Sequence, residues 1–243
     1  KIWSAKGAGQ RIKLIKAMTD NEEGKRVADT ILEQKNRFHL SNSEIAILYR
    51  TNAQSRVFEE HLRRSNIPYK IFGGLSFYQR KEVKDLLAYL RLTVNPKDNE
   101  AFKRSVNFPK RGIGNTTVEK VLAHAAENEL SAIEAIDTVQ LPARALGKLK
   151  EFKGMIQVFA QKMQVMDAYA LSTYIFLQSG LQKLINSDIT MEGVNRKENV
   201  VALLDGIKEF VDEDQVDENE STDRSLAGYI QNIALLTDFD AKE

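Results

Sequence analysis

Hydrophobic and polar positions along the first 75 residues suggest short strands that alternate with helices. Three short runs are strand candidates: 12–18, which is apolar and β-branched, 45–49, which suits a buried strand, and 69–72. Between them, 21–34 and 51–64 carry apolar residues at helical spacing, and Thr51-x-x-Gln54 fits a capping box. Strands separated by helices with short connections are typical of parallel pairing. We therefore expect an α/β fold here, with a partial parallel sheet.

The pattern changes after Gly73-Gly74. Apolar residues between Leu149 and Met166 recur at intervals of three and four, as they do on the core-facing side of a helix. The segments 80–92, 200–211 and 226–236 look helical too, and no later stretch alternates convincingly with a period of two. The sequence thus predicts a mostly α-helical second domain, whose boundary lies near the two glycines.

Charge divides the chain differently from hydrophobicity. The formal net charge is only +1, but residues 1–120 hold 24 Lys and Arg against 13 Asp and Glu, whereas residues 121–243 hold 11 against 21. The most acidic stretch, 209–223, has eight acidic residues and no basic one. A basic half favours a polyanionic partner, and an acidic half does not share that contact surface.

Several classes of protein are excluded by what the sequence lacks. It has no cysteine, which removes disulfides, thiolate catalysis and cysteine-ligated zinc or iron–sulfur sites. No apolar run approaches the roughly 20 residues of a membrane span, and no signal peptide opens the chain. We therefore expect a cytoplasmic protein without membrane contact. The chain begins at Lys1 rather than Met, and a three-stranded sheet is small, so we expect a segment of a longer protein.

The sharpest local motif is Pro109-Lys110-Arg111-Gly112-Ile113-Gly114. Two glycines around one apolar residue permit a tight turn between helices, with Ile113 in the core, and Thr116-x-x-Glu119 fits a capping box at the next helix. Backbone N–H groups at that helix start, close to Lys110 and Arg111, suit a phosphate. The pattern is typical of a helix–hairpin–helix, which grips the duplex backbone without reading sequence. An ordinary glycine turn with scattered surface charge is the alternative.

A second candidate site consists of Arg50, Asn52 and Arg56, where the expected strand ends and a helix begins. Ligands usually bind at this position in α/β sheets, and the three side chains suit phosphates or base edges. The residues alone favour a structural explanation, in which Thr51 caps the helix, Asn52 forms the turn and Arg56 lies on a solvated face.

Gly73-Gly74 adjoins aromatic and basic residues, a combination that suits stacked bases. A hinge with a packed aromatic plug is the favoured interpretation. His39, His61 and His124 are isolated, and the chain has no G-x-x-x-x-G-K-[ST] phosphate loop. We therefore expect no catalytic residue and no metal site.

These motifs, in this order and spacing, resemble the bacterial UvrD/Rep/PcrA superfamily 1 DNA helicases. The matching segments are 46–56, Gly73-Gly74 with 77–85, 88–92 and 111–114. The resemblance implies that 1–75 is the first, incomplete part of the RecA-like motor domain 2A. It also implies that 76–238 is the helical inserted domain 2B, and that 239–243 returns toward 2A.

The resemblance also implies a function. The parent protein would be an ATP-dependent 3′-to-5′ DNA helicase that uses ATP and magnesium in repair or replication. This segment lacks the family's nucleotide-binding and metal-binding motifs, so we expect it to hold no cofactor and to hydrolyse no ATP alone. By similarity, Arg50 and Asn52 contact the single strand, the Gly-Ile-Gly turn from Lys110 to Thr116 holds the duplex, and Gly73-Gly74 is a hinge.

The expected partners are single-stranded and duplex DNA, bound without sequence preference, and the rest of the helicase motor. Repair or replication proteins are further candidate partners. A hypothesis from a different class is a regulatory protein-interaction module that acts through the acidic helical half.

Overall fold

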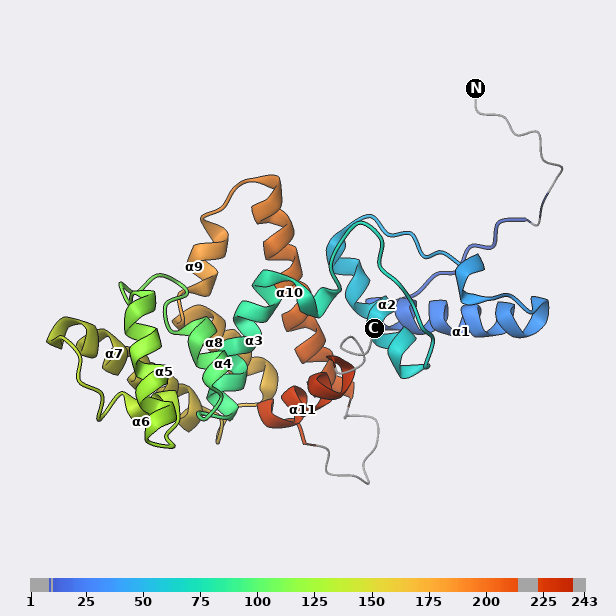
Figure 1. Cartoon of the computed structure of the whole chain (residues 1–243). Coiled ribbons are helices and arrows are strands. Elements are labelled where there is room, and N and C mark those ends of the chain that lie inside the picture. The colour runs from blue at the N-terminus through green and yellow to red at the C-terminus, as the bar shows by residue number, and fades with distance from the viewer. Residues whose placement is uncertain (1–8, 10, 214–222, 238–243) are drawn as a thin grey trace. The chain divides into compact units, whose positions relative to one another are not determined.

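The computed structural model describes residue 9, residues 11–213 and residues 223–237, and helices dominate that part (Figure 1). The chain divides into two units. Unit 1 consists of residues 1–47 and 57–69, and unit 2 consists of residues 48–56 and 70–243. Each unit has a hydrophobic core of its own.

Unit 1 is built on α1 (Asp20–Phe38), η1 (Asn42–Glu44) and most of α2 (Ser55–Arg64). α1 begins where the Thr19 hydroxyl accepts the N–H of Glu22 at 3.1 Å, and acidic residues occupy its first turn. The small core of the unit contains Ala28, Ile31, Leu62 and Ile67. The helices of this unit thus share only a small apolar core.

The α/β fold expected for the first 75 residues is wrong, because the described residues contain no strand. β-branched apolar residues favour extended backbone, and Ile45 indeed has φ −117° and ψ 134°. A strand also requires hydrogen bonds to a neighbouring strand, and the three apolar runs form no such ladder in the described part. Ile12, Leu14 and Leu48 are more than four-fifths exposed rather than buried in a sheet.

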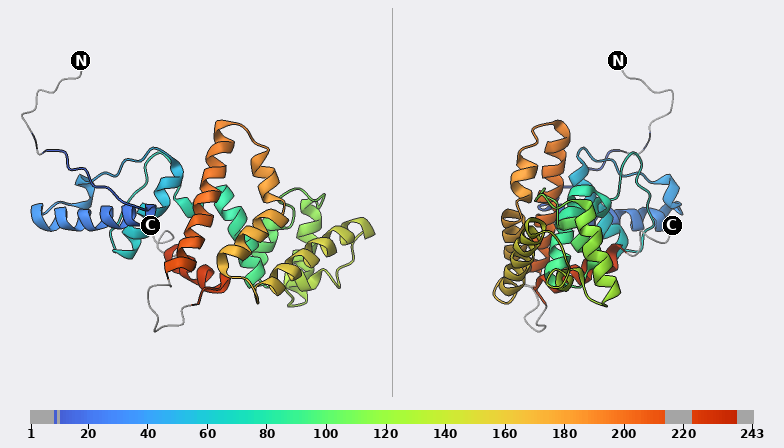
Figure 2. Two further views of the ribbon diagram at one scale, coloured as in Figure 1. Left: turned by 180° about the vertical axis from the view of Figure 1, so that it is seen from behind. Right: turned by 60° about the vertical axis from the view of Figure 1, so that its left-hand side comes forward.

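Unit 2 is a group of helices preceded by the short turns η2 (Asn52–Gln54) and η3 (Phe77–Gln79). The helices of this unit are α3 (Lys81–Val94), α4 (Asn99–Ser105), α5 (Asn115–Glu127), α6 (Ala132–Ala135), α7 (Ala143–Lys162), α8 (Ala168–Gln178), α9 (Leu181–Asn186), α10 (Met191–Glu213) and α11 (Leu226–Thr237). α3 lies among α4, α7, α8, α10 and α11 (Figure 2). Leu86, Tyr89 and Leu90 of α3 are fully buried, so this helix is the centre of the larger core.

The helical spacing predicted between Leu149 and Met166 is present in α7 and the turn after it. Its core-facing residues Leu149, Phe152, Ile156 and Phe159 are all buried. The ring of Phe152 packs edge-on against Tyr89 and Phe102, at centroid distances of 6.3 and 6.0 Å. α7 therefore packs against α3 and α4 through the hydrophobic core.

Candidate nucleic-acid interface

The chain between α4 and α5 forms a loop that we call the glycine turn (residues 106–114). Gly112 has a φ of +75°, a conformation that residues with a Cβ rarely adopt. Oδ1 of Asn107 accepts the N–H groups of Arg111 and Ile113 at 2.8 and 3.2 Å, and Ile113 is only 1% exposed. The turn is therefore closed by Asn107 and anchored in the core by Ile113.

α5 begins at Asn115 without a side-chain cap. The capping box expected at Thr116 is absent, because Gly114 is the N-cap and its carbonyl accepts the N–H groups of Thr117 and Val118. Within the described residues, the backbone N–H groups of Asn115 and Thr116 have no hydrogen-bond acceptor, and both residues are exposed. A helix start that is open in this way favours an anionic group such as a phosphate.

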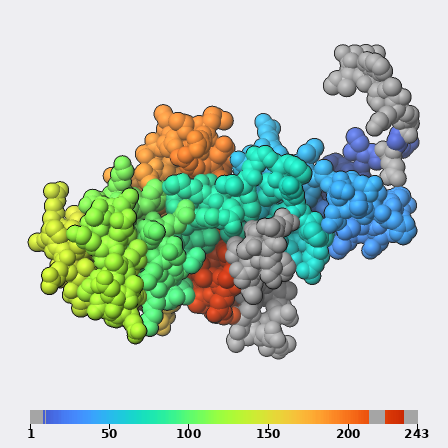
Figure 3. All heavy atoms as spheres, in the orientation of Figure 1, coloured from blue at the N-terminus to red at the C-terminus, as the bar shows by residue number. Residues whose placement is uncertain are grey.

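Exposed groups surround the start of α5. Lys110 is exposed, as are Gly112 and Gly114, and no ion pair of Lys110 is found in the part of the chain that the structure describes. The green atoms of α4 and α5 lie on an open face of unit 2 in the space-filling view (Figure 3). The glycine turn thus offers one ammonium group and backbone donors to the solvent.

Arg111 differs from Lys110, because its guanidinium lies against the protein. Nη1 donates to the carbonyl oxygens of Ser105 and Pro109, both at 3.1 Å, and Nη2 donates to the carbonyl of Ser179 at 2.8 Å. The guanidinium also lies over the rings of Tyr89 and Phe152, at 5.7 and 5.3 Å from their centroids. Arg111 therefore ties the end of α4, the glycine turn and the end of α8 together.

Tyr89 of α3 also contacts the glycine turn through its hydroxyl. Its hydroxyl lies 3.0 Å from the carbonyl oxygen of Ser105 and 2.6 Å from that of Phe108, to which it donates. Burial of the phenol raises the pKa of Tyr89 to about 12. No sequence motif marked Tyr89 as part of the site. The signal that could have found it is a hydroxyl-bearing aromatic residue on the buried side of α3, because such a hydroxyl needs a hydrogen-bond partner.

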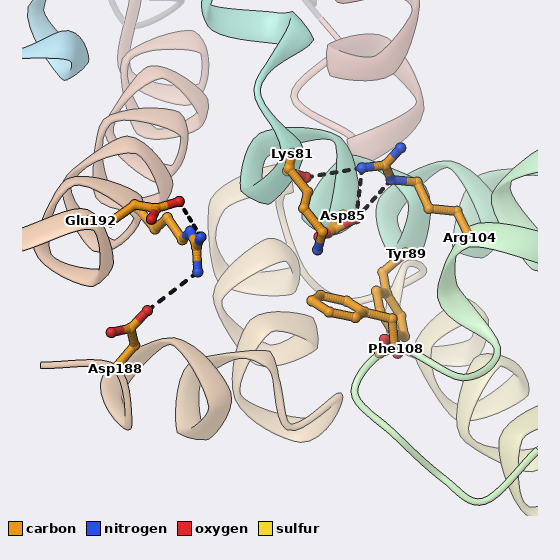
Figure 4. Close-up of polar contacts among 8 residues, drawn as sticks. Lys81, Asp85, Tyr89, Arg104, Phe108, Asp188 and Glu192 are labelled. Carbon is orange, nitrogen blue, oxygen red and sulfur yellow. Dashed lines mark hydrogen bonds and ion pairs between the residues drawn. The ribbon is translucent and has the colours of Figure 1, made fainter. Parts of the chain in front are cut away.

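A cluster of charges joins α3 to α4 beside the turn (Figure 4). The Asp85 carboxylate is 4% exposed and accepts Nζ of Lys81 and Nε of Arg104, each at 2.8 Å. The ammonium of Lys81 lies 3.8 Å from the ring centroid of Phe108. Both cations pair with the one buried carboxylate, although the Lys81 side chain remains 63% exposed. The cluster therefore joins α3 to α4, and Asp85 offsets part of its positive charge.

The second candidate site lies on a segment that we call the Asn52 loop (residues 50–55). The capping box predicted at Thr51 and Gln54 is confirmed, and Oε1 of Gln54 accepts the N–H groups of Arg50 and Thr51 at 2.9 and 3.0 Å. Arg50 and Asn52 are exposed. The Asn52 loop therefore presents two polar side chains on a backbone whose first donors are already used.

Arg56 lies next to that loop but is only 3% exposed. Its Nη2 forms an ion pair with Oε2 of Glu209 at 3.0 Å. Gly206 makes room for this pair, because a Cβ at that position would lie 2.6 Å from Nη1 of Arg56. The structure thus brings Arg50 and Asn52 to the surface and places Arg56 against α10.

The proposed hinge residues lie in an exposed bend of unit 2. Gly73 has a φ of +79°, which favours glycine, whereas Gly74 does not have a positive φ. A Cβ at either position would meet no atom within 4 Å. Backbone conformation, not crowding, therefore explains the glycine at position 73.

A protein site for magnesium is built from carboxylate and other oxygen ligands, and many nucleotide-binding proteins hold phosphates in a glycine-rich loop. Among residues 9, 11–213 and 223–237, no group of three or more His, Asp or Glu side chains could hold a metal ion. The whole sequence lacks the G-x-x-x-x-G-K-[ST] phosphate loop.

Two predicted features lie largely or wholly outside the described residues. The first is the acidic stretch 209–223, of which residues 214–222 are not described. The second is the return segment 239–243. Of the helices that the structure describes, none combines the length and the apolar character that a membrane crossing requires.

A glycine turn that opens an uncapped helix beside an exposed lysine is suited to holding nucleic-acid backbone. Comparison with known families gives a more specific result. The family model described as the UvrD-like helicase C-terminal domain matches residues 1–243. The chain belongs to this family, and the predicted resemblance to UvrD and PcrA helicases is confirmed at that level.

Curated relatives carry the name ATP-dependent DNA helicase PcrA. The protein of Bacillus subtilis is 36% identical over 242 residues, which cover 98% of this chain and 32% of the relative. The protein of Leuconostoc citreum is 34% identical over 244 residues (99% and 32%), and that of Staphylococcus aureus strain Mu50 is 33% identical over 242 residues (98% and 32%). The chain thus spans about a third of the length of these relatives.

Proposed function

We propose that this chain is the DNA-contacting C-terminal part of an ATP-dependent 3′-to-5′ DNA helicase. In this proposal, residues 1–75 belong to motor domain 2A, residues 76–238 form the inserted domain 2B, and residues 239–243 lead back toward 2A. The family match and the names of the relatives support the helicase assignment. The observation that carries a DNA-binding role is the uncapped start of α5 beside the exposed Lys110.

The glycine turn holds the backbone of duplex DNA in this proposal. Lys110, Gly112, Gly114 and Thr116 supply an ammonium group, backbone N–H groups and a hydroxyl to phosphates, whereas Arg111 and Ile113 hold the turn in shape. Phosphates are the same at every base pair, so these contacts grip without reading sequence. Such a grip suits an enzyme that moves along DNA, and it weakens steeply with salt because counterions are released on binding.

The Asn52 loop contacts the tracking single strand in this proposal. Arg50 supplies a charge for phosphate, and Asn52 supplies an amide for phosphate or base edges. Arg56 is left out of the contact set because it is buried and paired with Glu209. Gly73-Gly74 acts as the hinge of domain 2B, which the exposed bend and the positive φ of Gly73 support.

ATP and magnesium are bound by other parts of the parent protein in this proposal, and this chain alone hydrolyses no ATP. The absence of a phosphate loop from the sequence supports this division. The test is ATP turnover with single-stranded DNA, measured for the chain and for a longer parent protein that contains it. Turnover by the chain alone would overturn the division.

Two glycine substitutions, compared by their affinity for duplex DNA, test the proposed DNA contact of the glycine turn. Gly112→Ala forces a Cβ onto a backbone with a φ of +75°, and we expect it to lower the affinity for blunt duplex about tenfold by distorting the turn. Gly147→Ala is the matched control, because Gly147 lies in α7 with open space around it. Equal duplex affinities of the two variants, measured by fluorescence anisotropy, would contradict the role of the turn.

A further inference from the structure

One buried arginine joins the Asn52 loop to the helices of unit 2. Arg80 is 8% exposed, and its Nη1 donates to the backbone carbonyl of Asn52 at 2.6 Å and to Oδ1 of Asn199 at 2.8 Å. Its Nη2 donates to Oγ of Ser55 at 2.8 Å. A single guanidinium therefore binds both ends of η2 and a side chain of α10.

The partner of Arg80 on α10 is itself held in place. Nδ2 of Asn199 donates to Oε1 of Glu82 at 2.6 Å, which turns Oδ1 of the same amide toward Arg80. Asn199 and Ser55 are 3% and 1% exposed. Because water does not compete at such buried groups, each hydrogen bond restrains the loop more than it would at the surface.

A second contact with α10 lies at Glu209. The ion pair between Arg56 and Glu209 fixes the residue that follows the loop, and Gly206 allows its close approach. The Asn52 loop is thus bound to α10 at two levels, Asn199 and Glu209. The two contacts with α10 and the capping box of Gln54 restrain the backbone of the loop. The side chains of Arg50 and Asn52 remain exposed.

We infer that Arg80 is a positioning residue for single-strand binding. It holds the carbonyl of Asn52 so that the exposed side chains of Arg50 and Asn52 are pre-arranged for the strand, and binding then costs less conformational entropy. The inference rests on the proposed single-strand contact of the Asn52 loop. A planar guanidinium is needed, because its N–H groups donate in fixed directions to Asn52, Ser55 and Asn199 at once, which a lysine ammonium cannot reproduce.

The experiment compares two conservative substitutions in the same helical region of the whole chain. Arg80→Lys keeps the positive charge but loses the planar guanidinium. Arg91→Lys is the matched control, because Arg91 is an exposed arginine of α3 that pairs with Asp98. Binding of labelled oligothymidine and of blunt duplex is measured by anisotropy. Hydrogen exchange is followed at the amides of 51–54.

For Arg80→Lys we expect single-strand affinity to fall about five- to tenfold and duplex affinity to change less than about twofold, with faster exchange at 51–54. Arg91→Lys should leave all three readouts unchanged. Single-strand binding of Arg80→Lys equal to that of the control would overturn the inference. So would an equal loss of single-strand and duplex affinity, which indicates general destabilisation.

Two further variants keep the result interpretable. Ser55→Ala deletes one acceptor of Arg80, so it tests the same role if Arg80→Lys fails to fold; a loss of about two- to threefold in single-strand affinity is expected, and no loss would contradict the role. Arg50→Ala tests the proposed contact itself. If Arg50→Ala weakens single-strand binding and Arg80→Lys does not, only the positioning role fails; if Arg50→Ala has no effect, the proposed contact fails.

Discussion

The glycine turn and the Asn52 loop differ in which of their groups are left open to a ligand. At the glycine turn the exposed donors are backbone N–H groups at the start of α5, with Lys110 beside them. In the Asn52 loop the N–H groups of Arg50 and Thr51 are already bound by Gln54, and the groups assigned to the ligand are the exposed side chains of Arg50 and Asn52. Truncating side chains should therefore harm the loop more, and distorting the backbone should harm the turn more.

The two regions share one feature, an arginine that binds backbone carbonyls from inside. Arg111 does this for the glycine turn, and Arg80 does it for the Asn52 loop. Arg111, which lies in the glycine turn, and Arg80, which lies outside the Asn52 loop, thus both hold the backbone of a proposed contact site in place. Substitutions at these arginines should change the shape of a site rather than simply its charge.

The largest effect is expected at the glycine turn from Arg111→Ala. This change leaves the carbonyls of Ser105, Pro109 and Ser179 without their guanidinium donor. We expect a loss of about 3 kcal/mol in the free energy of unfolding and at least about a tenfold loss of duplex affinity. Urea unfolding and duplex anisotropy measure the two quantities. Arg111→Lys should lose most of the same affinity; if it retains full affinity, charge alone explains the residue.

A somewhat smaller effect is expected on the loop side from Gly206→Ala. The added Cβ would lie 2.6 Å from Nη1 of Arg56, so the ion pair with Glu209 must shift. We expect a destabilisation of about 2 kcal/mol in urea unfolding. Gly154→Ala in α7, where a Cβ has open space, should instead be neutral or slightly stabilising. Similar unfolding midpoints for both variants would show that the close approach is not needed.

Tyr89→Phe is expected to cost about 1 kcal/mol at neutral pH, because the partly buried carbonyl of Phe108 loses its hydroxyl donor. Burial raises the pKa of Tyr89 from 10.0 to about 12. The unfolded chain therefore ionises first, and stability that is present below pH 10 is lost as the pH rises toward 12. Over that range the tyrosine protein should lose about 2 kcal/mol relative to Tyr89→Phe. A difference that does not depend on pH would contradict a buried, protonated Tyr89.

The smallest effect is expected outside both contact regions, at the bend. Gly73→Ala should cost about 1 kcal/mol in urea unfolding because alanine disfavours a φ of +79°. Gly74→Ala has equally open surroundings without a positive φ, so it should be neutral or slightly stabilising. Indistinguishable stabilities would mean that the bend relaxes to accept a side chain.

Two features set by neighbours in the sequence were predicted well, whereas a third, the capping box expected at Thr116, is absent because the helix already begins at Asn115. The spacing from Leu149 predicted the buried side of α7, and Thr51-x-x-Gln54 predicted the capping box. The three apolar runs gave the wrong prediction, because a preference for extended backbone does not supply a partner strand.

The direction of an arginine side chain could not be read from its motif either. Arg111 binds Ser179, which is 68 positions away, and Arg80 binds Asn199, which is 119 positions away. The family resemblance pointed to both proposed contact segments, but only the folded chain separates the buried Arg56 from the exposed Arg50. Tertiary contacts of this kind depend on packing of distant helices, which local spacing does not encode.

The most direct test of the account is the salt dependence of duplex binding at the glycine turn. Lys110→Ala is compared with Lys25→Ala, which removes the same charge from an exposed position of α1 in unit 1. We expect Lys110→Ala to weaken binding to duplexes of unrelated sequence equally, and to reduce the slope of log affinity against log salt by about 1. Lys25→Ala should leave the slope unchanged. An unchanged slope for Lys110→Ala, or a loss confined to one DNA sequence, would contradict a sequence-independent grip on phosphates.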